Sequence, residues 1–398
     1  MRILVHDFAG HPFAVQLSRE LARRGHAVLH LYSSVNKTPK GALAHQADDP
    51  AGLEIRPLAA GQDYRRNSFG QRWRDERAYG AVLADVIREW RPEVAIIGNT
   101  PLDVLAPARP ALKAVGARFV FWVQDLLGIA SHKILRARLP IAGEIVGRYH
   151  IAMEKRFARE ADALVLITDD FTPILRGWGV PAERLHVIEN WGPLGEIVPR
   201  PRRNPWAEKH RLIDRRVFLY TGSMGLKHDP GLLVALARHL KGRTDAAVVV
   251  VSEGRGADVL AAYKRDEGLD SLHVLPFQPY GEMPDVLGTG DVMLAVLGAD
   301  AGVFSVPSKV LSYLCAGRPV LGAMPAENLA ARMVRDNGLG VVVAPDDERG
   351  FLAAADRLLA DEAERVRLGA NAAAYAASRF GMGRIGDEFE RVLAASWA

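Results

Sequence analysis

The chain has 398 residues, 49% hydrophobic and 25% charged, which is enough to bury the cores of two or three domains and excludes the fibrous and disordered classes. Its 51 Lys and Arg are interspersed with 47 Asp and Glu, so composition gives no argument for nucleic acid. The single cysteine, Cys315, excludes an intramolecular disulfide and a thiolate zinc site and fits a reducing compartment. We expect a cytoplasmic protein, since the N-terminus lacks the layout of a signal peptide and no run of about 18 uncharged residues occurs.

Strand-like apolar runs alternate with amphipathic helical runs through the first half of the chain. The predicted strands are 3–8, 27–32, 94–98, 119–123, 163–168 and 185–188. The first helix is predicted at 12–24, because Pro12 suits a first turn and Gly25 provides a stop. Such alternation is typical of a parallel sheet with right-handed crossovers, helices on both faces and ligands at the carboxyl ends of the strands. Residues 1–191 are therefore expected to form one doubly wound, Rossmann-like domain.

A proline-rich break follows Asn190, and 192–205 is the predicted linker. A second alternating series then predicts strands at 217–220, 247–252, 272–277, 292–297, 320–323 and 341–344. Residues 206–380 are expected to form a second Rossmann-like domain. The helical patterns of the tail exceed what one more strand–helix unit needs, so 381–398 is predicted to be a helix that crosses back to the first domain.

The segment YTGSMGLKHDP, residues 220–230, lies where a predicted strand ends and a helix begins. Gly222 and Gly225 permit a tight turn, and Lys227 adds a positive charge beside free helix N–H groups. Such a loop suits a diphosphate, although glycine after a strand is also common turn chemistry. The segment fits neither the glycine pattern of dinucleotide-binding sites nor the Walker pattern of ATP-binding sites, so it does not support binding of NAD or ATP.

A second polar turn followed by a helix lies at 302–324, where the helix is predicted from about Ser308. Ser305, Ser308 and the first amides of this helix are candidates to receive phosphate oxygens, with Lys309 adding charge and Ser312 one turn further. The alternative is a helix that has only a structural role, with Ser308 near its N-cap. Two such helix starts in one domain predict a nucleotide diphosphate site, provided that they converge.

In the first domain, Gly10 and His11 follow the first predicted strand, and Gln124 and Asp125 end another. Since adjacent strand ends face the same crevice, His11 or Asp125 is a candidate to bind or deprotonate an acceptor hydroxyl. A packed histidine and a helix-capping aspartate are the structural alternatives. No spacing of His, Cys, Asp and Glu supports a metal cage.

Basic and apolar residues gather together at 131–159. A basic amphipathic segment of this kind is able to lie on an anionic membrane surface. The alternative is an ordinary helix that covers the sheet with its charged face in water.

Eight blocks, taken in order, give the sequence a specific resemblance over nearly its whole length: HDFAGHPFAVQLSRELARRGH, FWVQDL, VIENW, YTGSMGLK, VVSEG, LPFQPYGEMPDVL, DVMLAVL and VPSKVLSYLCAGRPV. The chain resembles the retaining glycosyltransferase family four, especially its bacterial surface-polysaccharide branch with colanic-acid, O-antigen and N-acetylfucosaminyltransferase-like enzymes. The resemblance implies the GT-B fold, two Rossmann-like domains facing across a cleft, and sugar transfer from a nucleotide diphosphate-sugar, with a UDP-sugar favoured. It implies a polyprenyl diphosphate-linked saccharide as acceptor, no metal or other cofactor, and a place at the inner face of the plasma membrane.

The resemblance also implies roles for single residues. The implied donor-binding residues are Gly222, Ser223, Lys227, Glu253, Phe277, Gln278, Ser305, Ser308, Lys309 and Ser312. Gly10, His11, Gln124 and Asp125 are implied on the acceptor side. Catalysis is expected to rest on Lys227, which stabilises the diphosphate as the bond to the sugar breaks, with His11 and Asp125 as further candidates.

Three positions depart from the common family pattern. Many members carry an arginine after the first loop glycine and a pair of glutamates eight residues apart, where this chain has Ser223, Phe304 and Ser312. Two alternatives therefore stand beside the transferase: a nucleotide-sugar epimerase of the same fold, and an inactive nucleotide-binding assembly partner.

Overall fold

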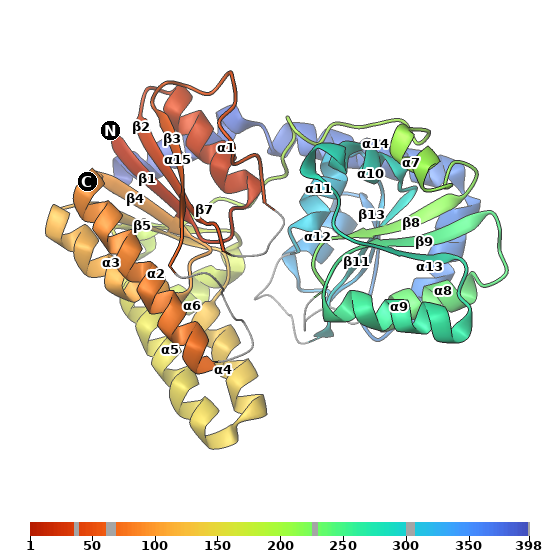
Figure 1. Ribbon diagram of the computed structural model, residues 1–398, viewed down its shortest axis with the longest axis horizontal. Helices are drawn as coiled ribbons and strands as arrows, with labels where there is room; N and C mark the ends of the chain where they lie inside the picture. The colour runs from red at the N-terminus through yellow and green to blue at the C-terminus, as the bar shows by residue number, and fades with distance from the viewer. Residues whose placement is uncertain (36–39, 61–68, 225–229, 300–306, 397–398) are drawn as a thin grey trace. The chain divides into compact units, whose positions relative to one another are not determined.

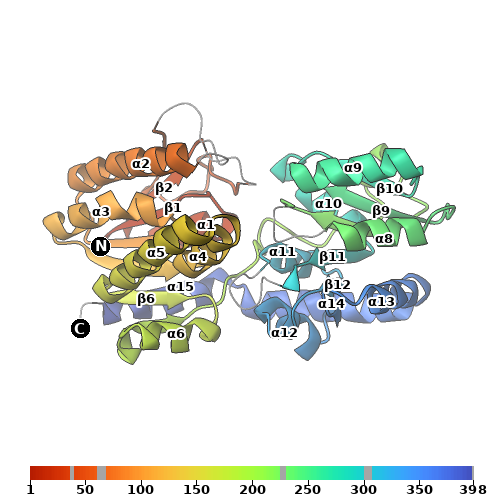
Figure 2. The same cartoon turned by 90° about the horizontal axis from the view of Figure 1, so that it is seen from below.

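The computed structural model describes residues 1–35, 40–60, 69–224, 230–299 and 307–396. The chain folds into two compact units. Unit 1 comprises Met1–Glu189 and Met382–Ala398, and unit 2 comprises Asn190–Gly381. Each unit is built on one parallel sheet with helices on both of its faces (Figures 1 and 2). The two Rossmann-like domains expected from the sequence are thus confirmed.

The sheet of unit 1 has seven parallel strands in the order β3-β2-β1-β4-β5-β6-β7. The strands are β1 (Arg2–Asp7), β2 (Ala27–Ser33), β3 (Leu53–Leu58), β4 (Val94–Gly98), β5 (Arg118–Val123), β6 (Ala163–Leu166) and β7 (Leu185–Val187). The central strands are continuous apolar runs, as in the fully buried β4, because a parallel sheet is covered on both faces. The chain turns from β1 outward to β3 and then returns to β4 beside β1, so β1 and β4 flank the switch point of this sheet.

Nine helical segments of the described chain complete unit 1. They are α1 (Pro12–Arg23), α2 (Phe69–Trp90), α3 (Leu102–Val115), α4 (Leu127–Arg138), α5 (Pro140–Glu160), η1 (Asp169–Phe171), α6 (Thr172–Gly177), η2 (Ala182–Arg184) and α15 (Met382–Ala395). The last helix packs against α1, where His26 Nε2 lies 2.8 Å from Glu390 Oε1.

Two features of unit 1 differ from the sequence prediction. Strand β3 was not predicted, and the basic segment 131–159 is not one helix. It belongs to α4 and α5, which are separated at Leu139 because Pro140 begins a new helix. The two helices lie side by side as a hairpin (Figure 1).

The sheet of unit 2 has six parallel strands in the order β10-β9-β8-β11-β12-β13. They are β8 (Arg216–Thr221), β9 (Ala246–Val251), β10 (Leu272–Leu275), β11 (Val292–Val296), β12 (Val320–Ala323) and β13 (Gly340–Val343). Strand β9, AAVVVV, is buried throughout and lies within the apolar core of this unit. Strands β8 and β11 flank the switch point, so their carboxyl ends form the expected ligand crevice of unit 2.

Helices cover both faces of this second sheet (Figure 2). They are α7 (Pro205–Lys209), α8 (Gly231–His239), α9 (Arg255–Glu267), η3 (Tyr280–Glu282), α10 (Met283–Thr289), α11 (Lys309–Cys315), α12 (Leu329–Asp336), α13 (Glu348–Ala360) and α14 (Glu362–Arg379). Several begin at an aspartate or asparagine whose side chain accepts a backbone N–H, as Asp347 does from Gly350.

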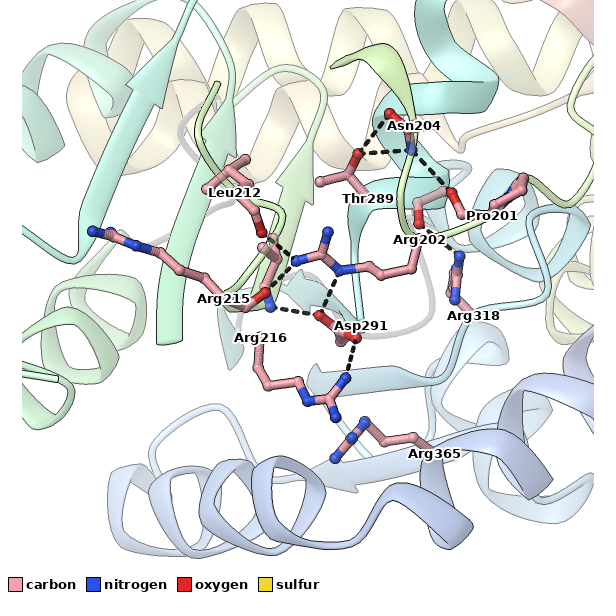
Figure 3. Close-up of polar contacts among 12 residues, drawn as sticks. Pro201, Arg202, Asn204, Leu212, Arg215, Arg216, Thr289, Asp291, Arg318 and Arg365 are labelled. Atoms are coloured by element: carbon pink, nitrogen blue, oxygen red, sulfur yellow. Dashed lines mark hydrogen bonds and ion pairs between the residues drawn. The ribbon is translucent and has the colours of Figure 1, made fainter. Parts of the chain in front are cut away.

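An arginine cluster around Asp291 fastens the proline-rich segment to the amino edge of the second sheet (Figure 3). The Asp291 carboxylate accepts bonds from Arg202 Nε at 2.9 Å and from the Val217 backbone N–H at 2.8 Å. Arg216 Nη1 lies 3.5 Å from the same carboxylate, and Arg318 donates to the Arg200 carbonyl at 2.9 Å. This edge is opposite the carboxyl edge, where a ligand is expected. The small apolar-lined space beside the cluster has no volume for a ligand. The cluster therefore has a structural role.

Candidate functional site

The switch point of unit 1 holds a carboxylate–imidazole pair. Asp7 is the last residue of β1 and is buried, and His11 begins the turn into α1. His11 Nδ1 lies 3.3 Å from Asp7 Oδ2, and the His11 backbone N–H also donates to that carboxylate. Asn99, directly after β4, places its Nδ2 3.3 Å from His11 Nδ1 and has a left-handed φ of 45°. The ends of both switch-point strands therefore meet at His11.

Charge and burial act in opposite directions on this pair. Burial alone would lower the pKa of His11, but the charge and hydrogen bonds of Asp7, with a smaller contribution from Asp125, raise it above its ordinary value. Burial would raise the pKa of Asp7, but His11 lowers it. The arrangement favours an imidazolium facing a carboxylate, and it connects His11 with Asp125, two residues that the sequence had placed on the acceptor side.

A cavity of about 140 Å³ lies next to this pair, at the carboxyl ends of β4 and β5. Polar and apolar side chains share its walls, and the polar ones are Arg72, Glu76, Asn99, Thr100, Asp103, Gln124, Asp125, Ser131 and His150. Gln124 and Asp125 were predicted from the sequence, whereas His11 and Gly10 do not line the cavity itself. The polar side chains of the cavity walls favour a ligand that carries hydroxyl groups, because buried polar groups need hydrogen-bonding partners.

Two side chains at the cavity keep hydrogen-bonding capacity. His150 Nε2 lies 3.4 Å from Asp103 Oδ2, while the buried His150 Nδ1 and Asp103 Oδ1 have no hydrogen-bond partner in the described part of the chain. Behind them, Glu154 is buried and accepts a bond from the Gly128 N–H at 2.9 Å. Burial raises the pKa of Glu154 to about 8, with a smaller contribution from Asp125, against the effect of its backbone bonds. The Glu154 carboxyl is therefore largely neutral at pH 7.

The switch point of unit 2 brings Gly222 and Lys309 together from segments far apart in sequence. Gly222 directly follows β8 and has a φ of 102°, a conformation that favours glycine. A Cβ placed on Gly222 would lie 3.9 Å from Lys309 Nζ. That nitrogen sits 3.6 Å from the centre of the Tyr220 ring, within the range of a cation–π contact. A lysine amine thus lies against the loop that the sequence assigned to a diphosphate, and burial lowers the pKa of this amine well below its ordinary value.

Helix α11 is held in this position by Tyr313. The Tyr313 hydroxyl accepts a bond from the Thr221 backbone N–H at 3.0 Å and lies 3.3 Å from the Leu294 carbonyl. Lys309 is one turn earlier on the same helix, so it reaches the same strand end. Ser308 is the residue before the helix, but its side chain makes no capping hydrogen bond.

The remaining predicted donor residues line the neighbouring strand ends. The Glu253 carboxylate, after β9, accepts the Phe277 backbone N–H, after β10, at 3.1 Å. Gln278 accepts a bond from the indole N–H of Trp206 at 3.0 Å. Lys227 and Ser305 lie outside the described residues, as does Phe304. Within the described ranges, no group of three or more His, Cys, Asp and Glu is arranged to hold a metal ion.

Sequence reasoning missed Asp7, Asn99, Asp103, His150 and Glu154. Asp7 was read as part of a strand, although its position four residues before His11, at the strand end, was the available signal. His150 and Glu154 lie on a helix, and only the fold brings them to a cavity whose other walls are strand ends.

Two family comparisons cover most of the chain. Residues 10–191 match the family described as "Glycosyl transferase 4-like domain", and residues 203–375 match "Glycosyl transferases group 1". The chain belongs to the group 1 glycosyltransferases, family four. The order of the two matches fits two Rossmann-like units, the first with the aspartate–histidine pair and the second with the Gly222 loop.

The curated relatives of this glycosyltransferase are distant. It is 24% identical to an alpha-D-kanosaminyltransferase of Streptomyces kanamyceticus over 241 residues, which are 59% of this chain and 61% of that protein. It is 28% identical to a D-inositol 3-phosphate glycosyltransferase of Xylanimonas cellulosilytica over 249 residues, 60% of this chain and 57% of the relative. The matches thus span about three-fifths of the length of these relatives.

Solved structures share the GT-B fold of this glycosyltransferase. Anabaena HepE, solved in complex with UDP-glucose, has a TM-score of 0.71 and 16% identity over 99% of this chain and all of that one. WaaG, a glycosyltransferase involved in lipopolysaccharide biosynthesis, has a TM-score of 0.66 and 16% identity over 97% and 99% of the two chains. At this identity the likeness concerns the fold.

The α4–α5 hairpin of the glycosyltransferase carries a concentrated apolar surface. Half of the twelve large hydrophobic side chains that are exposed in the described chain lie between 134 and 149. They are Ile134, Leu139, Ile141, Ile145, Val146 and Tyr149. Ile141 is 81% exposed, while Arg136 and Arg148 nearby are also exposed and approach the Glu144 carboxylate at 3.7 and 2.6 Å. None of the described helices is long and apolar enough to span a bilayer.

Proposed function

We propose that this protein is a retaining glycosyltransferase that moves a sugar from a nucleotide diphosphate-sugar, with a UDP-sugar favoured, onto a lipid-linked saccharide of surface-polysaccharide synthesis. The observation that carries the proposal is the meeting of the Gly222 loop with Lys309 at the switch point of unit 2. The UDP-glucose complex of HepE and the lipopolysaccharide role of WaaG support the donor and the pathway class. An N-acetylamino sugar is one candidate for the transferred group.

The donor site is assigned to the carboxyl edge of the second sheet. Gly222, Ser223 and Lys227 receive the diphosphate, and Ser305, Ser308, Lys309 and Ser312 approach it from the other side of the switch point. Glu253, Phe277 and Gln278 flank the base. Lys227 stabilises the negative charge that develops on the diphosphate as the bond to the sugar breaks.

The acceptor is assigned to the cavity at the carboxyl ends of β4 and β5 in unit 1. Gln124 and Asp125 lie in its wall and face saccharide hydroxyls. His11 contacts the wall residue Asn99, and Gly10 precedes His11 in the turn after β1. His11 or Asp125 orients the attacking hydroxyl and assists loss of its proton. His150 Nδ1 and Asp103 Oδ1, which have no hydrogen-bond partner among the described residues, provide further bonds to a saccharide.

The α4–α5 hairpin is assigned to an anionic membrane surface. Leu127, Ser131 and His150 of the hairpin also line the cavity, so a lipid-linked acceptor held there would have its lipid close to the apolar hairpin surface. The segment 127–160 carries seven Lys and Arg against three Glu, of which Glu154 is buried and largely neutral. Apolar side chains and excess positive charge together favour anionic lipid.

A donor-panel assay tests the function. Purified protein is mixed with UDP- and GDP-sugars and bacterial membrane lipid extract, and release of free UDP or GDP is measured. We expect release that depends on both one donor and the lipid extract. Failure of every donor, with extract present, would reject sugar transfer.

Two alternatives are each identified by a separate measurement. Conversion of UDP-N-acetylglucosamine without any lipid extract would identify an epimerase. UDP binding in calorimetry, without turnover of any donor, would identify the inactive nucleotide-binding partner. This alternative is motivated by Phe304 and Ser312, which stand where many family members have glutamates.

A further inference from the structure

Lys309 carries a buried amine that lacks a hydrogen-bond partner. The residue as a whole is partly exposed, but its Nζ is inaccessible to solvent and donates no hydrogen bond within the described ranges. Its contact is the face of Tyr220, at 3.6 Å from the ring centre. An aromatic ring attracts an ammonium but does not replace three hydrogen-bond acceptors, so the charged form is poorly stabilised here.

The position of this amine points to a ligand rather than to packing. It lies beside Gly222, since a Cβ placed there would be 3.6 Å from Lys309 Cε and 3.9 Å from Nζ. Gly222 follows β8, and Lys309 belongs to the connection after the neighbouring β11. The amine therefore lies at the carboxyl ends of the strands beside the switch point, where open α/β sheets bind ligands.

We propose that Lys309 Nζ contacts the donor diphosphate beside Gly222 and takes up one proton from solvent when the diphosphate binds. This inference rests on the function proposed above and adds a proton linkage to its donor site. The proton that Nζ gains becomes one of three donors on the ammonium, which then bonds to diphosphate oxygens.

Electrostatics supports the linkage. Burial lowers the pKa of Lys309 well below its ordinary value. The titratable groups facing this position from β8 and α11 are Tyr220 and Tyr313, and burial raises the pKa of both, that of Tyr313 to about 12. Helix α14 packs on the end of α11 through uncharged Gly369 and Ala373. Two neutral tyrosines supply no negative charge to an ammonium, whereas a diphosphate would raise the pKa of Lys309 on binding.

Calorimetry tests the linkage in the wild-type protein. UDP is titrated at pH 8, where its terminal phosphate, with a second pKa of about 6, is already ionised. The titration is repeated in two buffers whose ionisation enthalpies differ. We expect the measured enthalpy to change with the buffer in the sense of net proton uptake. UDP binding with no dependence on the buffer would overturn the proton linkage.

Substitutions of Lys309 test whether this residue takes up the proton when UDP binds. Lys309→Met should weaken UDP binding roughly tenfold to 100-fold and abolish the buffer dependence, because one charged hydrogen-bond donor is lost. Lys309→Arg stays charged, so it should bind UDP without proton uptake. Lys209→Met, at an exposed lysine of the same unit, is the matched control. UDP binding by Lys309→Met that equals wild type would overturn the contact.

The same data separate this inference from the proposed function. If wild-type protein binds neither UDP nor GDP, the nucleotide-sugar function fails and the inference fails with it. If wild type binds UDP and the Lys309 variants do so unchanged, the function stands and only the role of Lys309 is rejected. Circular dichroism of each variant shows whether it is folded.

Discussion

The carboxylate of Asp7 holds the imidazole of His11 at the end of β1, with 3.3 Å between Oδ2 and Nδ1. Asp7 is buried and His11 is partly exposed, so the pair has one face fixed by the sheet and one face available to a ligand. Such an arrangement orients the ring and favours its charged form, and both effects depend on the charge of Asp7.

Removing that charge should lower the pKa of His11. In Asp7→Asn the attraction that raises this pKa is lost, while the burial that lowers it remains. We expect the imidazole resonance of His11, assigned with a His11→Gln variant, to titrate at lower pH. If His11 acts as base, the acid limb of kcat/KM moves to lower pH as well.

Asp48→Asn serves as the control for this change, because Asp48 is 77% exposed in the same unit. It should leave the His11 titration where it is in wild type. An unchanged His11 titration in Asp7→Asn would show that the carboxylate does not set the charge of the ring.

Lys227→Ala should reduce transfer about 100-fold or more, as the loss of a group that stabilises transition-state charge commonly does. The measurement is the rate of UDP release under saturating donor and acceptor. Lys209→Ala removes an exposed lysine from the same unit and should keep the wild-type rate. Unchanged turnover in Lys227→Ala would remove Lys227 from the catalytic assignment.

The hairpin should bind anionic vesicles at low salt, and Ile145→Glu should abolish this binding. The substitution removes an apolar contact and adds a negative charge facing anionic lipid. Val366→Glu on α14 is a matched control, because Val366 and Ile145 are both 65% exposed. Flotation with vesicles is the measurement, and added salt should weaken it. Absence of wild-type flotation at low salt would contradict the membrane assignment.

Fully buried strands were predictable, and the edge strand was not. Strand β9 is a run of six apolar residues, so it stands out in the sequence. Strand β3, LEIRPL, lies at the edge of its sheet, where Glu54 and Arg56 are exposed to varying degrees and Pro57 interrupts the apolar pattern. At this open edge the strand is only partly buried, so it lacks the continuous apolar run on which the prediction depends.

Only the local backbone conformation of the candidate site could be predicted from the sequence. A glycine after a strand predicted the positive φ of Gly222, since this depends on local geometry. The burial of Lys309 against Tyr220 depends on residues 89 positions apart in the chain, as does the bond from Thr221 to Tyr313, 92 positions away. The periodicity of apolar residues carries no information about such contacts. The sequence therefore showed a lysine at position 309, but it did not show that the amine is buried against Tyr220.

Asp291→Ala should destabilise unit 2 by about 3 kcal/mol or more, because it removes the carboxylate from a partly buried ion pair and leaves Arg202 without it. The free energy of urea unfolding measures the loss. Asp214→Ala breaks the exposed pair with Arg203 and should change stability little. Equal stability of the two variants would show that the arginine cluster does not need Asp291.

Glu154→Gln should become more stable relative to wild type as pH rises from about 5 to about 8. The pKa of Glu154 is about 8 in the folded protein, against an ordinary value of 4.5. The folded state therefore holds a proton that the unfolded state has lost, and wild type loses stability as pH rises through this window. Glutamine imitates the neutral carboxyl and has no such loss.

The measurement is the urea midpoint of both proteins at several pH values between 5 and 9. Glu160→Gln, on the same helix but one-third exposed, controls for the change of side chain. The stability difference at Glu154 should grow until about pH 8 and then level off, because above that pH the folded-state carboxyl is already ionised. A difference that stays constant between pH 5 and 8 would mean that Glu154 is ionised in the folded protein, and that the hairpin's excess positive charge is smaller than assigned.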